Sequence, residues 1–263
     1  MSFRFLFITQ EDPFYVRLFF EEYFATAATL SDVAGVVIAP TMGRKSKLRL
    51  ARQMYDFYGP IDFFRMTAKF AWYKLARKLP WTGRPGSFYS IDQVCRHFGV
   101  EVIRTTDLNS REFLDEARRI SPDLIVSVAA PQIFRTELVN LPKQGCINIH
   151  NSRLPKYRGM LPNFWQMYNG ERLLGATVHR INDALDDGPI LAQHEVAAIS
   201  GETLDSVICR TKRQGAQLMR TVIERIRDGQ ITELPNVKDE ATYYTFPTKE
   251  ITRDFRKRGY KLL

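Results

Sequence analysis

The sequence predicts an α/β fold built on a doubly wound, mostly parallel sheet. Two observations lead to this prediction: β-like and helical segments alternate through the first 150 residues, and the strand-like segments are almost continuously apolar. Parallel strands covered by helices on both faces show such apolar runs, and strand–helix–strand order is typical of these sheets. The 263 residues, 44% hydrophobic and 25% charged, are enough for one sizeable globular domain with a short appendage.

The elements of the first half follow from these patterns in chain order. The segment SREFLDEARRI is amphipathic, and Ser110 stands before it as a candidate N-cap. The segment DLIVSVAA shows no polar alternation, as expected for a strand with both faces covered. Strands are expected at 3–9, 33–40, 98–105, 123–130 and 146–150, and helices at about 13–28, 90–97 and 110–120.

The second half changes character, because its strands are longer and end in one long helix. Thr203 is a candidate cap for that helix, and Gly229 follows its last turn. The last residues, from 231 to 263, are expected to form a small C-terminal extension. The predicted elements before it are strands at 175–181 and 189–199, the connecting loop 182–188 and the helix at 201–229.

Cysteine usage and hydropathy argue against a disulfide-rich protein and against a membrane-spanning one. Cys95, Cys146 and Cys209 are far apart and odd in number, so neither a metal site nor a disulfide framework is indicated. A reducing, cytoplasmic compartment is therefore expected. No apolar run approaches the roughly 20 residues that cross a bilayer. The N-terminal apolar patch lacks a small-residue cleavage site, so we interpret it as a first strand and not as a signal peptide.

The basic charge is concentrated in one segment. Residues 44–84 hold eleven basic residues and two acids, which accounts for the whole net charge of +9. The same segment is rich in aromatic residues, and Gly59–Pro60 is expected to break it into two helices. Two interpretations stay open. The helices could lie in a membrane interface at the cytoplasmic face, or form a hairpin that packs against its own domain or a second subunit of a homodimer.

Three polar residues at strand and loop ends form a candidate site. Asn148 and His150 are two apart on a strand, so their side chains point to the same face, and Asp186 lies in the later loop. An amide can donate to a developing oxyanion, an imidazole can shuttle a proton, and a carboxylate can orient the imidazole. Neither Ser152 nor Cys146 has the surroundings of a nucleophile, which favours direct attack by a substrate.

The longer string around these residues resembles the folate-dependent formyltransferase family, which includes methionyl-tRNA, glycinamide ribonucleotide and sugar N-formyltransferases. The family pattern is N-x-H-x-S-x-L-P-x-x-R-G, then G-x-T-x-H, then L-D-x-G-x-I. The resemblance is strongest over about 120–215 and implies a Rossmann-like formyltransferase domain over 1–230, with a basic aromatic insertion at about 43–84. The matching positions are Asn148, His150, Ser152, Leu154, Pro155, Arg158, Gly159, Gly175, Thr177, His179, Leu185, Asp186, Gly188 and Ile190.

The resemblance implies roles for individual residues. Asn148, His150 and Asp186 take the positions of the catalytic triad, and 10-formyltetrahydrofolate is the implied co-substrate, without a metal. Ser152, Arg158 and Gly159 shape the turn beside the site or contact the substrate, whereas His179 is interpreted as a structural strand residue. The implied pterin-binding residues are Gln132, Ile133 and Phe134 on one side and Ile181, Asn182, Asp183 and Leu185 on the other.

The resemblance leaves the acceptor amine open among several classes. The segment ITQEDPFYV after the first strand has no glycine to cradle a phosphate, which disfavours glycinamide ribonucleotide. A methionyl-tRNA enzyme usually carries a further C-terminal barrel, for which the residues after the long helix are too few. An amino sugar, linked to a nucleotide or a lipid and used in polysaccharide biosynthesis, is therefore preferred. Methionyl-tRNA, and water in a formyltetrahydrofolate hydrolase, remain the alternatives.

Overall fold

The computed structural model describes residues 3–41, 47–78 and 88–263. Its centre is a seven-stranded sheet in the order β3-β2-β1-β4-β5-β7-β8. The five strands from β3 to β5 are parallel, and β7 and β8 run antiparallel to their neighbours, which confirms the predicted doubly wound, mostly parallel fold. The strands are β1 (Phe5–Gln10), β2 (Val33–Ala39), β3 (Val102–Arg104), β4 (Leu124–Val128), β5 (Cys146–His150), β7 (Leu173–Arg180) and β8 (Ile190–Ala197).

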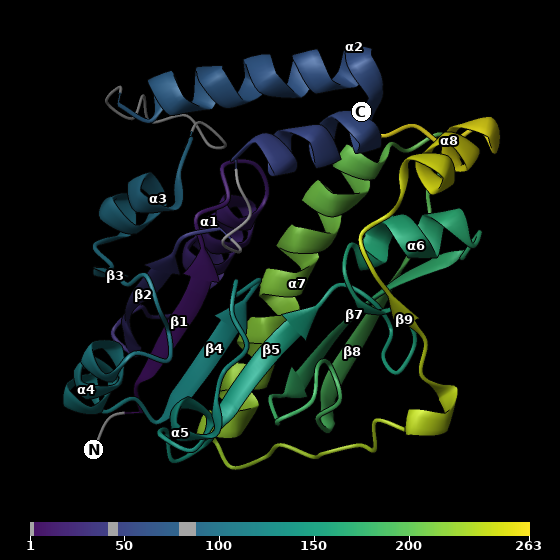
Figure 1. The fold of residues 1–263 in the computed structure, drawn as a ribbon. Helices are drawn as coiled ribbons and strands as arrows, with labels where there is room; N and C mark the ends of the chain where they lie inside the picture. Colours follow the sequence, from purple (N-terminus) through teal and green to yellow (C-terminus); the bar gives the residue numbers. More distant parts are fainter. Residues whose placement is uncertain (1–2, 42–46, 79–87) are drawn as a thin grey trace.

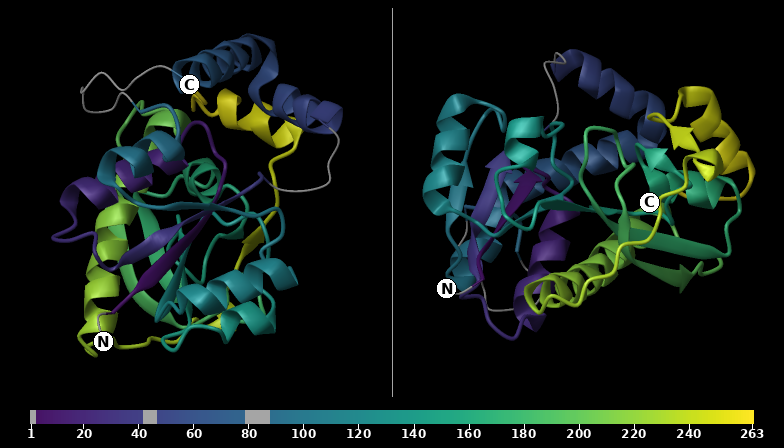
Figure 2. Two further views of the ribbon diagram at one scale, coloured as in Figure 1. Left: turned by 90° about the vertical axis from the view of Figure 1, so that its left-hand side faces the viewer. Right: turned by 90° about the horizontal axis from the view of Figure 1, so that it is seen from below.

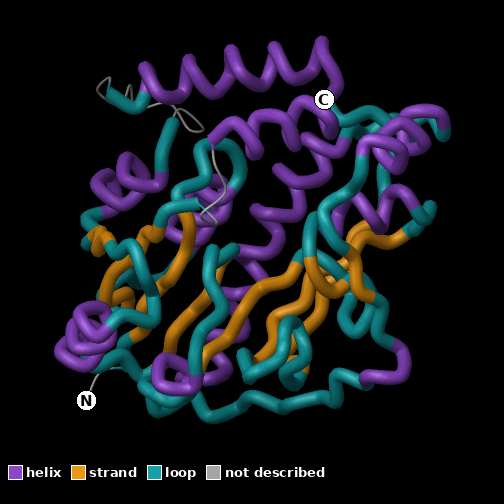
Figure 3. The backbone as a smooth tube through the Cα atoms, viewed as in Figure 1, coloured by secondary structure: helices purple, strands orange, loops and turns teal. Residues whose placement is uncertain are grey.

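Helices cover both faces of this sheet (Figure 1 and Figure 3). One face carries α1, α3 and α7, whose apolar side chains form a core with alternate residues of β1, β4 and β5. The other face carries α4 and α5 over the remaining strand residues. Because both faces are covered, the strands need no polar alternation. These helices are α1 (Val16–Thr26), α3 (Ile91–Phe98), α4 (Arg111–Ile120), α5 (Thr136–Val139) and α7 (Leu204–Arg227).

Local capping fixes several boundaries. Ser110 accepts a hydrogen bond from Phe113 N and Thr203 accepts one from Ser206 N, so both predicted N-caps are confirmed. The predicted strand at 98–105 begins too early, because α3 continues to Phe98 and ends on Gly99, whose φ of 70° provides a left-handed cap. The strand itself therefore covers only Val102–Arg104.

The basic aromatic segment forms the kinked helix α2 (Lys47–Ala76), as the Gly59–Pro60 pair predicts. Gly59 adopts a φ of 67° inside it, which separates two helical halves. The first half contributes Phe57 to a third apolar core, and the second half lies at the outer surface of the molecule (Figure 2). The basic residues Arg44, Lys45 and Arg84 lie outside the described residues.

The segment after α7 returns to the main domain. It passes along the lower edge in Figure 1 and reaches β9 (Tyr243–Tyr244), which pairs in parallel with β6 (Arg158–Gly159). The chain then enters α8, whose Phe255 packs in the third core with Phe164 of α6. The remaining elements are α6 (Pro162–Tyr168), the 3-10 helix η1 (Lys238–Glu240) and α8 (Lys249–Lys257).

Candidate active site

The site is built on the end of β5, where two strands bring polar side chains together. In the antiparallel pairing of β5 with β7, Asn148 lies opposite His179 and His150 lies opposite Thr177. Asn148 and His150 are on the same face of the strand, as their spacing predicts. The opposite face of β5 carries Ile149, which packs in the core beneath α7. One face of the strand is therefore available for chemistry.

The loop between β7 and β8 delivers Asp186 to these side chains. Its Oδ1 lies 3.6 Å from His150 Nδ1 and 3.7 Å from His179 Nε2, and the residue is almost fully buried. Its Oδ2 accepts a hydrogen bond of 3.0 Å from the backbone N–H of Gly159. Asp186 also has a φ of 52°, a left-handed conformation that a non-glycine residue rarely adopts. The surrounding contacts must hold this conformation.

The two histidines have different hydrogen-bonding surroundings. His179 Nδ1 donates to the carbonyl of Arg180 at 2.7 Å, so its Nε2 accepts from the amide of Asn148 at 3.1 Å. Burial lowers the pKa of His179, and the nearby Asp186 only partly opposes this shift. A neutral His179 therefore fixes the nitrogen end of the Asn148 amide. His150 Nε2 donates to the carbonyl of Tyr157 at 2.7 Å, and its other nitrogen faces Asp186.

The neighbouring Asp187 is engaged in ion pairs and not in the candidate triad. Arg158 Nη1 lies 2.5 Å from its Oδ1, and Lys238 Nζ lies 3.3 Å from its Oδ2. Burial alone would raise the pKa of Asp187, but hydrogen bonds from these two cations lower it below its ordinary value. This arrangement agrees with the choice of Asp186 over Asp187 from the sequence pattern.

Asn236 ties the loop that carries Asp186 to the turn after β5, and the sequence interpretation missed it. Its Nδ2 donates to the carbonyls of Asp186 and Gly188, both at 3.0 Å, while its Oδ1 accepts from Arg158 Nη2 at 2.9 Å. We call these contacts the Asn236 clamp. No sequence signal pointed to it, because Asn236 lies 50 residues beyond the carboxylate that it supports.

Two motif glycines are required by close backbone approaches. A Cβ at Gly188 would lie 2.0 Å from the carbonyl oxygen of Arg180, and one at Gly159 would lie 2.3 Å from that of Tyr244. Ser152 is fully buried, and its Oγ donates to the carbonyl of Lys156 at 2.9 Å. Ser152 and Gly159 therefore shape the turn after β5, and Ser152 is not exposed as a nucleophile.

The residues expected around a pterin ring lie on two loops, one after β4 and one after β7. Gln132 is used structurally, since its amide bonds Leu108 N and the carbonyl of Thr106, and Phe134 is buried in the core. Ile133 on one loop and Leu185 on the other expose apolar side chains. The other three residues are in the second loop: Ile181 and Asn182 are partly buried, and Asp183 is exposed.

A buried lysine of α7 lies on the sheet face opposite the one that carries Asn148 and His150. Lys212 of α7 is 7% exposed, and burial lowers its pKa while Asp12 acts in the opposite direction. It lies one turn before Gly215, where the missing side chain lets α7 approach Ile149 of β5. Among the described residues, no carboxylate lies within ion-pair distance of Lys212. This residue was also missed from the sequence, where it is one of several cations on a helix.

The loop after β1 is closed to a phosphate. Asp12 Oδ1 accepts from the backbone N–H groups of Phe14, Tyr15 and Val16 at 2.8, 2.6 and 3.2 Å. A carboxylate of the chain itself thus occupies the N-terminus of α1, where a phosphate would otherwise bind. This geometry agrees with the prediction from the segment ITQEDPFYV.

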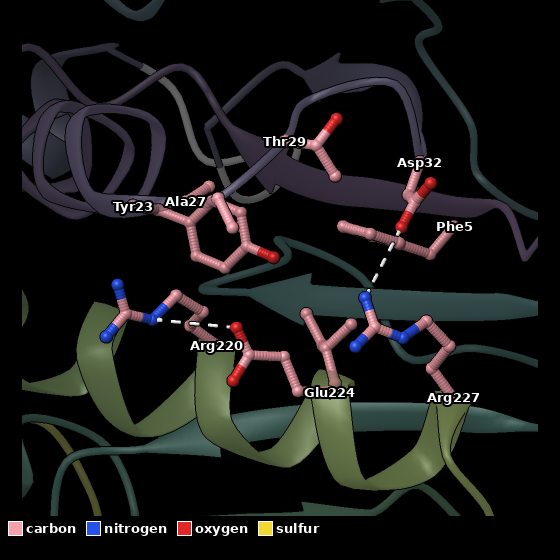
Figure 4. Close-up of a pocket in the computed structure, with 10 residues that line it drawn as sticks. Phe5, Tyr23, Ala27, Thr29, Asp32, Arg220, Glu224 and Arg227 are labelled. Atoms are coloured by element: carbon pink, nitrogen blue, oxygen red, sulfur yellow. Dashed lines mark ion pairs between the residues drawn. The ribbon is translucent and has the colours of Figure 1, made fainter.

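Two hollows elsewhere do not reach the triad. One, of about 30 Å³, lies between α1 and α7 at the amino ends of the strands (Figure 4). It is bordered by the ion pairs Arg220–Glu224 and Arg227–Asp32, and it is too small for more than water. The other, of about 440 Å³, borders Arg77, Arg96 and Arg104 near β3, two strands beyond β1 in the sheet.

A comparison with known sequence families shows which family the chain belongs to. The formyl transferase family matches residues 34–223, which is most of the chain and includes Asn148, His150 and Asp186. The chain belongs to the formyl transferase family. This membership confirms the resemblance found from the motif.

Several curated relatives of this formyl transferase are methionyl-tRNA formyltransferases. The one from Caldanaerobacter subterraneus subsp. tengcongensis is 31% identical over 170 residues, covering 64% of this chain and 55% of the relative. The one from Alkaliphilus oremlandii is 37% identical over 152 residues, covering 58% of this chain and 49% of the relative. The chain thus spans about half the length of the curated relatives it matches.

Solved formyltransferases share the fold. An N-formyltransferase from Helicobacter canadensis, in complex with folinic acid and dTDP-3-aminofucose, superposes with a TM-score of 0.58 at 16% identity over 93% of this chain and 71% of that one. Phosphoribosylglycinamide formyltransferase from Anaplasma phagocytophilum superposes with a TM-score of 0.59 at 14% identity over 94% and 100%. At these identities the likeness establishes the fold alone.

Proposed function

We propose that this formyl transferase moves the formyl group of 10-formyltetrahydrofolate to a primary amine. The observation that carries the proposal is the meeting of Asn148, His150 and Asp186 at the end of β5, where His179 accepts a hydrogen bond from the Asn148 amide. Family membership supports the same reaction. The products are a formamide and tetrahydrofolate, so no other reactant is needed.

In the proposed reaction, the neutral amine attacks the formyl carbon and a tetrahedral oxyanion forms. Asn148 has a second amide N–H, beyond the one bonded to His179, that can donate to this oxygen. Because His179 accepts from the nitrogen end of the amide, the donor and not the carbonyl faces the reacting oxygen. His179 is thus a positioning residue for Asn148.

The proton lost by the attacking amine passes to the His150–Asp186 pair and returns to the nitrogen of the leaving tetrahydrofolate. His150 Nε2 is hydrogen-bonded to the Tyr157 carbonyl, and a proton taken up at Nδ1 would face the Asp186 carboxylate 3.6 Å away. Cys146 and Ser152 are poorly suited to form a covalent intermediate, because both are buried and burial raises the pKa of the Cys146 thiol to about 12.

The folate would lie between the loops that carry Ile133 and Leu185. Their exposed apolar side chains can cover the two faces of a pterin ring, and backbone groups at 181–185 can hydrogen-bond its edge. Because Leu185 directly precedes Asp186, a folate held by this loop would have its formyl group near the proposed triad. The remaining residues implied by the resemblance would act through their backbone.

The acceptor that we propose is an amino sugar linked to a nucleotide or a lipid. Two observations support a compact acceptor carrying phosphate. Tyr244 stacks on Trp165 and Tyr157, with ring centroids 4.5 and 5.5 Å apart, and this aromatic wall narrows the space beside Gly159. Lys212 offers a buried ammonium group on α7, without a carboxylate at ion-pair distance among the described residues, and such a group is suited to a phosphate oxygen or a sugar hydroxyl.

A second candidate acceptor is methionyl-tRNA, which the names of the curated relatives favour. A screen with 10-formyltetrahydrofolate separates the two, using nucleotide-linked amino sugars in one series and methionyl-tRNA in the other. Release of tetrahydrofolate together with a formamide on an amino sugar is expected. Formylation of methionyl-tRNA alone would contradict the proposed acceptor, and free formate without any formamide would identify a hydrolase.

A further inference from the structure

The second half of α2 presents an apolar stripe to solvent. Ile61, Phe64 and Trp72 are 75%, 68% and 52% exposed, respectively. Steps of three and four residues place side chains on one face of a helix. We call the following set the apolar stripe: Ile61, Phe64, Ala68, Trp72 and Leu75. Contiguous exposed apolar surface of this kind marks an interaction site more often than scattered single residues do.

The opposite face of the same helix is fixed to the domain. Tyr73 contacts Phe14, with ring centroids 5.9 Å apart, and its hydroxyl accepts from Arg17. Lys69 Nζ lies 3.4 Å from Asp205 at the start of α7. The helix, which lies at the outside of the fold in Figure 1, is therefore anchored on its inner side, and the exposed fractions show that the apolar stripe faces solvent.

Cations border the apolar stripe on both sides. At 3.6 residues per turn, Arg65 lies at one edge of the stripe and Lys74 lies further round the helix on the other side, while Lys78 follows the end of the helix at Ala76. All three side chains are exposed. Long cationic side chains at the edges of an apolar helix face reach anionic lipid headgroups while the apolar residues enter the interface. Trp72 also fits this position, because tryptophan is enriched at the membrane–water interface.

We propose that the apolar stripe docks this formyl transferase on the surface of an anionic lipid bilayer. Among the described residues, no helix combines the length and apolarity needed to cross a bilayer, so α2 would lie in the plane of the surface. A second copy of the chain fits the stripe less well. Pairing two stripes would bring the bordering cations of both copies together, whereas anionic headgroups complement them.

Vesicle co-sedimentation tests this proposal and needs neither folate nor acceptor, so its result is independent of the proposed function. The full chain is mixed with vesicles of phosphatidylcholine alone, or of phosphatidylcholine with phosphatidylglycerol, at low and high salt. One variant combines Ile61→Ser, Phe64→Ser and Trp72→Ser, and a second combines Lys74→Gln with Lys78→Gln. Leu173→Ser, at an exposed apolar residue of β7, is the matched control.

The wild-type chain is expected to sediment with the anionic vesicles at low salt. The triple variant should reduce the bound fraction at least ~10-fold, since it removes the apolar contact. High salt and the double lysine variant should weaken binding, and Leu173→Ser should not. Equal binding by the triple variant, or no binding by the wild type, would overturn the proposal. A wild-type dimer that the triple variant loses, without vesicle binding, would show a contact between copies instead.

Discussion

The Asn236 clamp and the apolar stripe of α2 differ in almost every physical respect. Around the clamp, buried polar groups are bonded to each other across three segments: the turn after β5, the loop of Asp186 and the chain after α7. On the stripe, apolar side chains face solvent between cations. The contrast suits the two proposed roles. The proposed reaction needs polar groups held in a fixed geometry, whereas docking on a lipid surface needs only an exposed apolar face bordered by cations.

The largest expected effect is at the carboxylate itself. Asp186→Asn keeps the size of the side chain but removes its charge beside His150, so kcat should fall about 10²- to 10⁴-fold. Folate affinity should change little, because the side chain faces the histidines. Steady-state kinetics with a folate-binding titration measure both, and Asp239→Asn on the exposed η1 is the control. Full turnover by Asp186→Asn would remove this residue from the chemistry.

The Asn236 clamp should give the next largest effect. Asn236→Ala removes the contacts that hold Asp186 in its left-handed conformation, so kcat should fall on the order of 10-fold, with stability reduced by about 1–3 kcal/mol. Because the loop is only displaced, the acceptor KM should change less than kcat. Thr232→Ala, at an exposed position of the same segment, is the control. Equal loss in a purely structural variant such as Phe255→Leu would show that stability alone explains the result.

Lys212→Met should act on the acceptor and not on the reaction step. It keeps an apolar stem of similar length but removes the ammonium group, so the acceptor KM should rise on the order of 10-fold, with kcat within about twofold. Arg213→Met, one position along and partly exposed, is the comparison. An unchanged KM for every amino sugar that the enzyme accepts would show that Lys212 has no part in acceptor binding.

The smallest effect concerns His179 and the pH dependence of stability. Burial lowers its pKa in the folded state, so below the ordinary value of ~6.5 the unfolded chain binds the proton more readily. Stability is therefore lost as pH falls through this window, by at most ~1.4 kcal/mol per pH unit. In His179→Gln, denaturant unfolding should show a flatter pH dependence below pH ~6.5. An identical slope in both proteins would contradict the buried, neutral ring.

The sheet could be predicted because its signals are local in the sequence, whereas Asp186 was singled out only by the longer motif that resembles the family. Continuous apolar strands and the helix caps at Ser110 and Thr203 fix the layers. The same-face spacing of Asn148 and His150 needs only the two-residue period of a strand. The boundary between α3 and β3, at residues 98 to 101, was less predictable. Gly99 caps the helix in a left-handed conformation, but the sequence there could equally begin a strand.

Contacts that depend on the tertiary path could not be predicted. Asn236 and Thr242 are ordinary polar residues until the chain after α7 returns to the turn at Tyr157 and Arg158. Lys212 becomes unusual only through its burial beneath the strand ends. The basic aromatic pattern of α2 predicted the helices and their break, but the anchored face was decided by Phe14 and Asp205, far away in the sequence.

The most direct test of the account follows the formyl group in a single turnover. Purified protein is mixed with 10-formyltetrahydrofolate labelled in the formyl carbon and with an accepted amine, and the label is located by mass spectrometry as tetrahydrofolate is released. Direct transfer should place the label in a formamide on the amine, at the rate of tetrahydrofolate release and without a labelled protein intermediate. Label found only in formate, or attached to the chain, would contradict direct transfer at Asn148, His150 and Asp186.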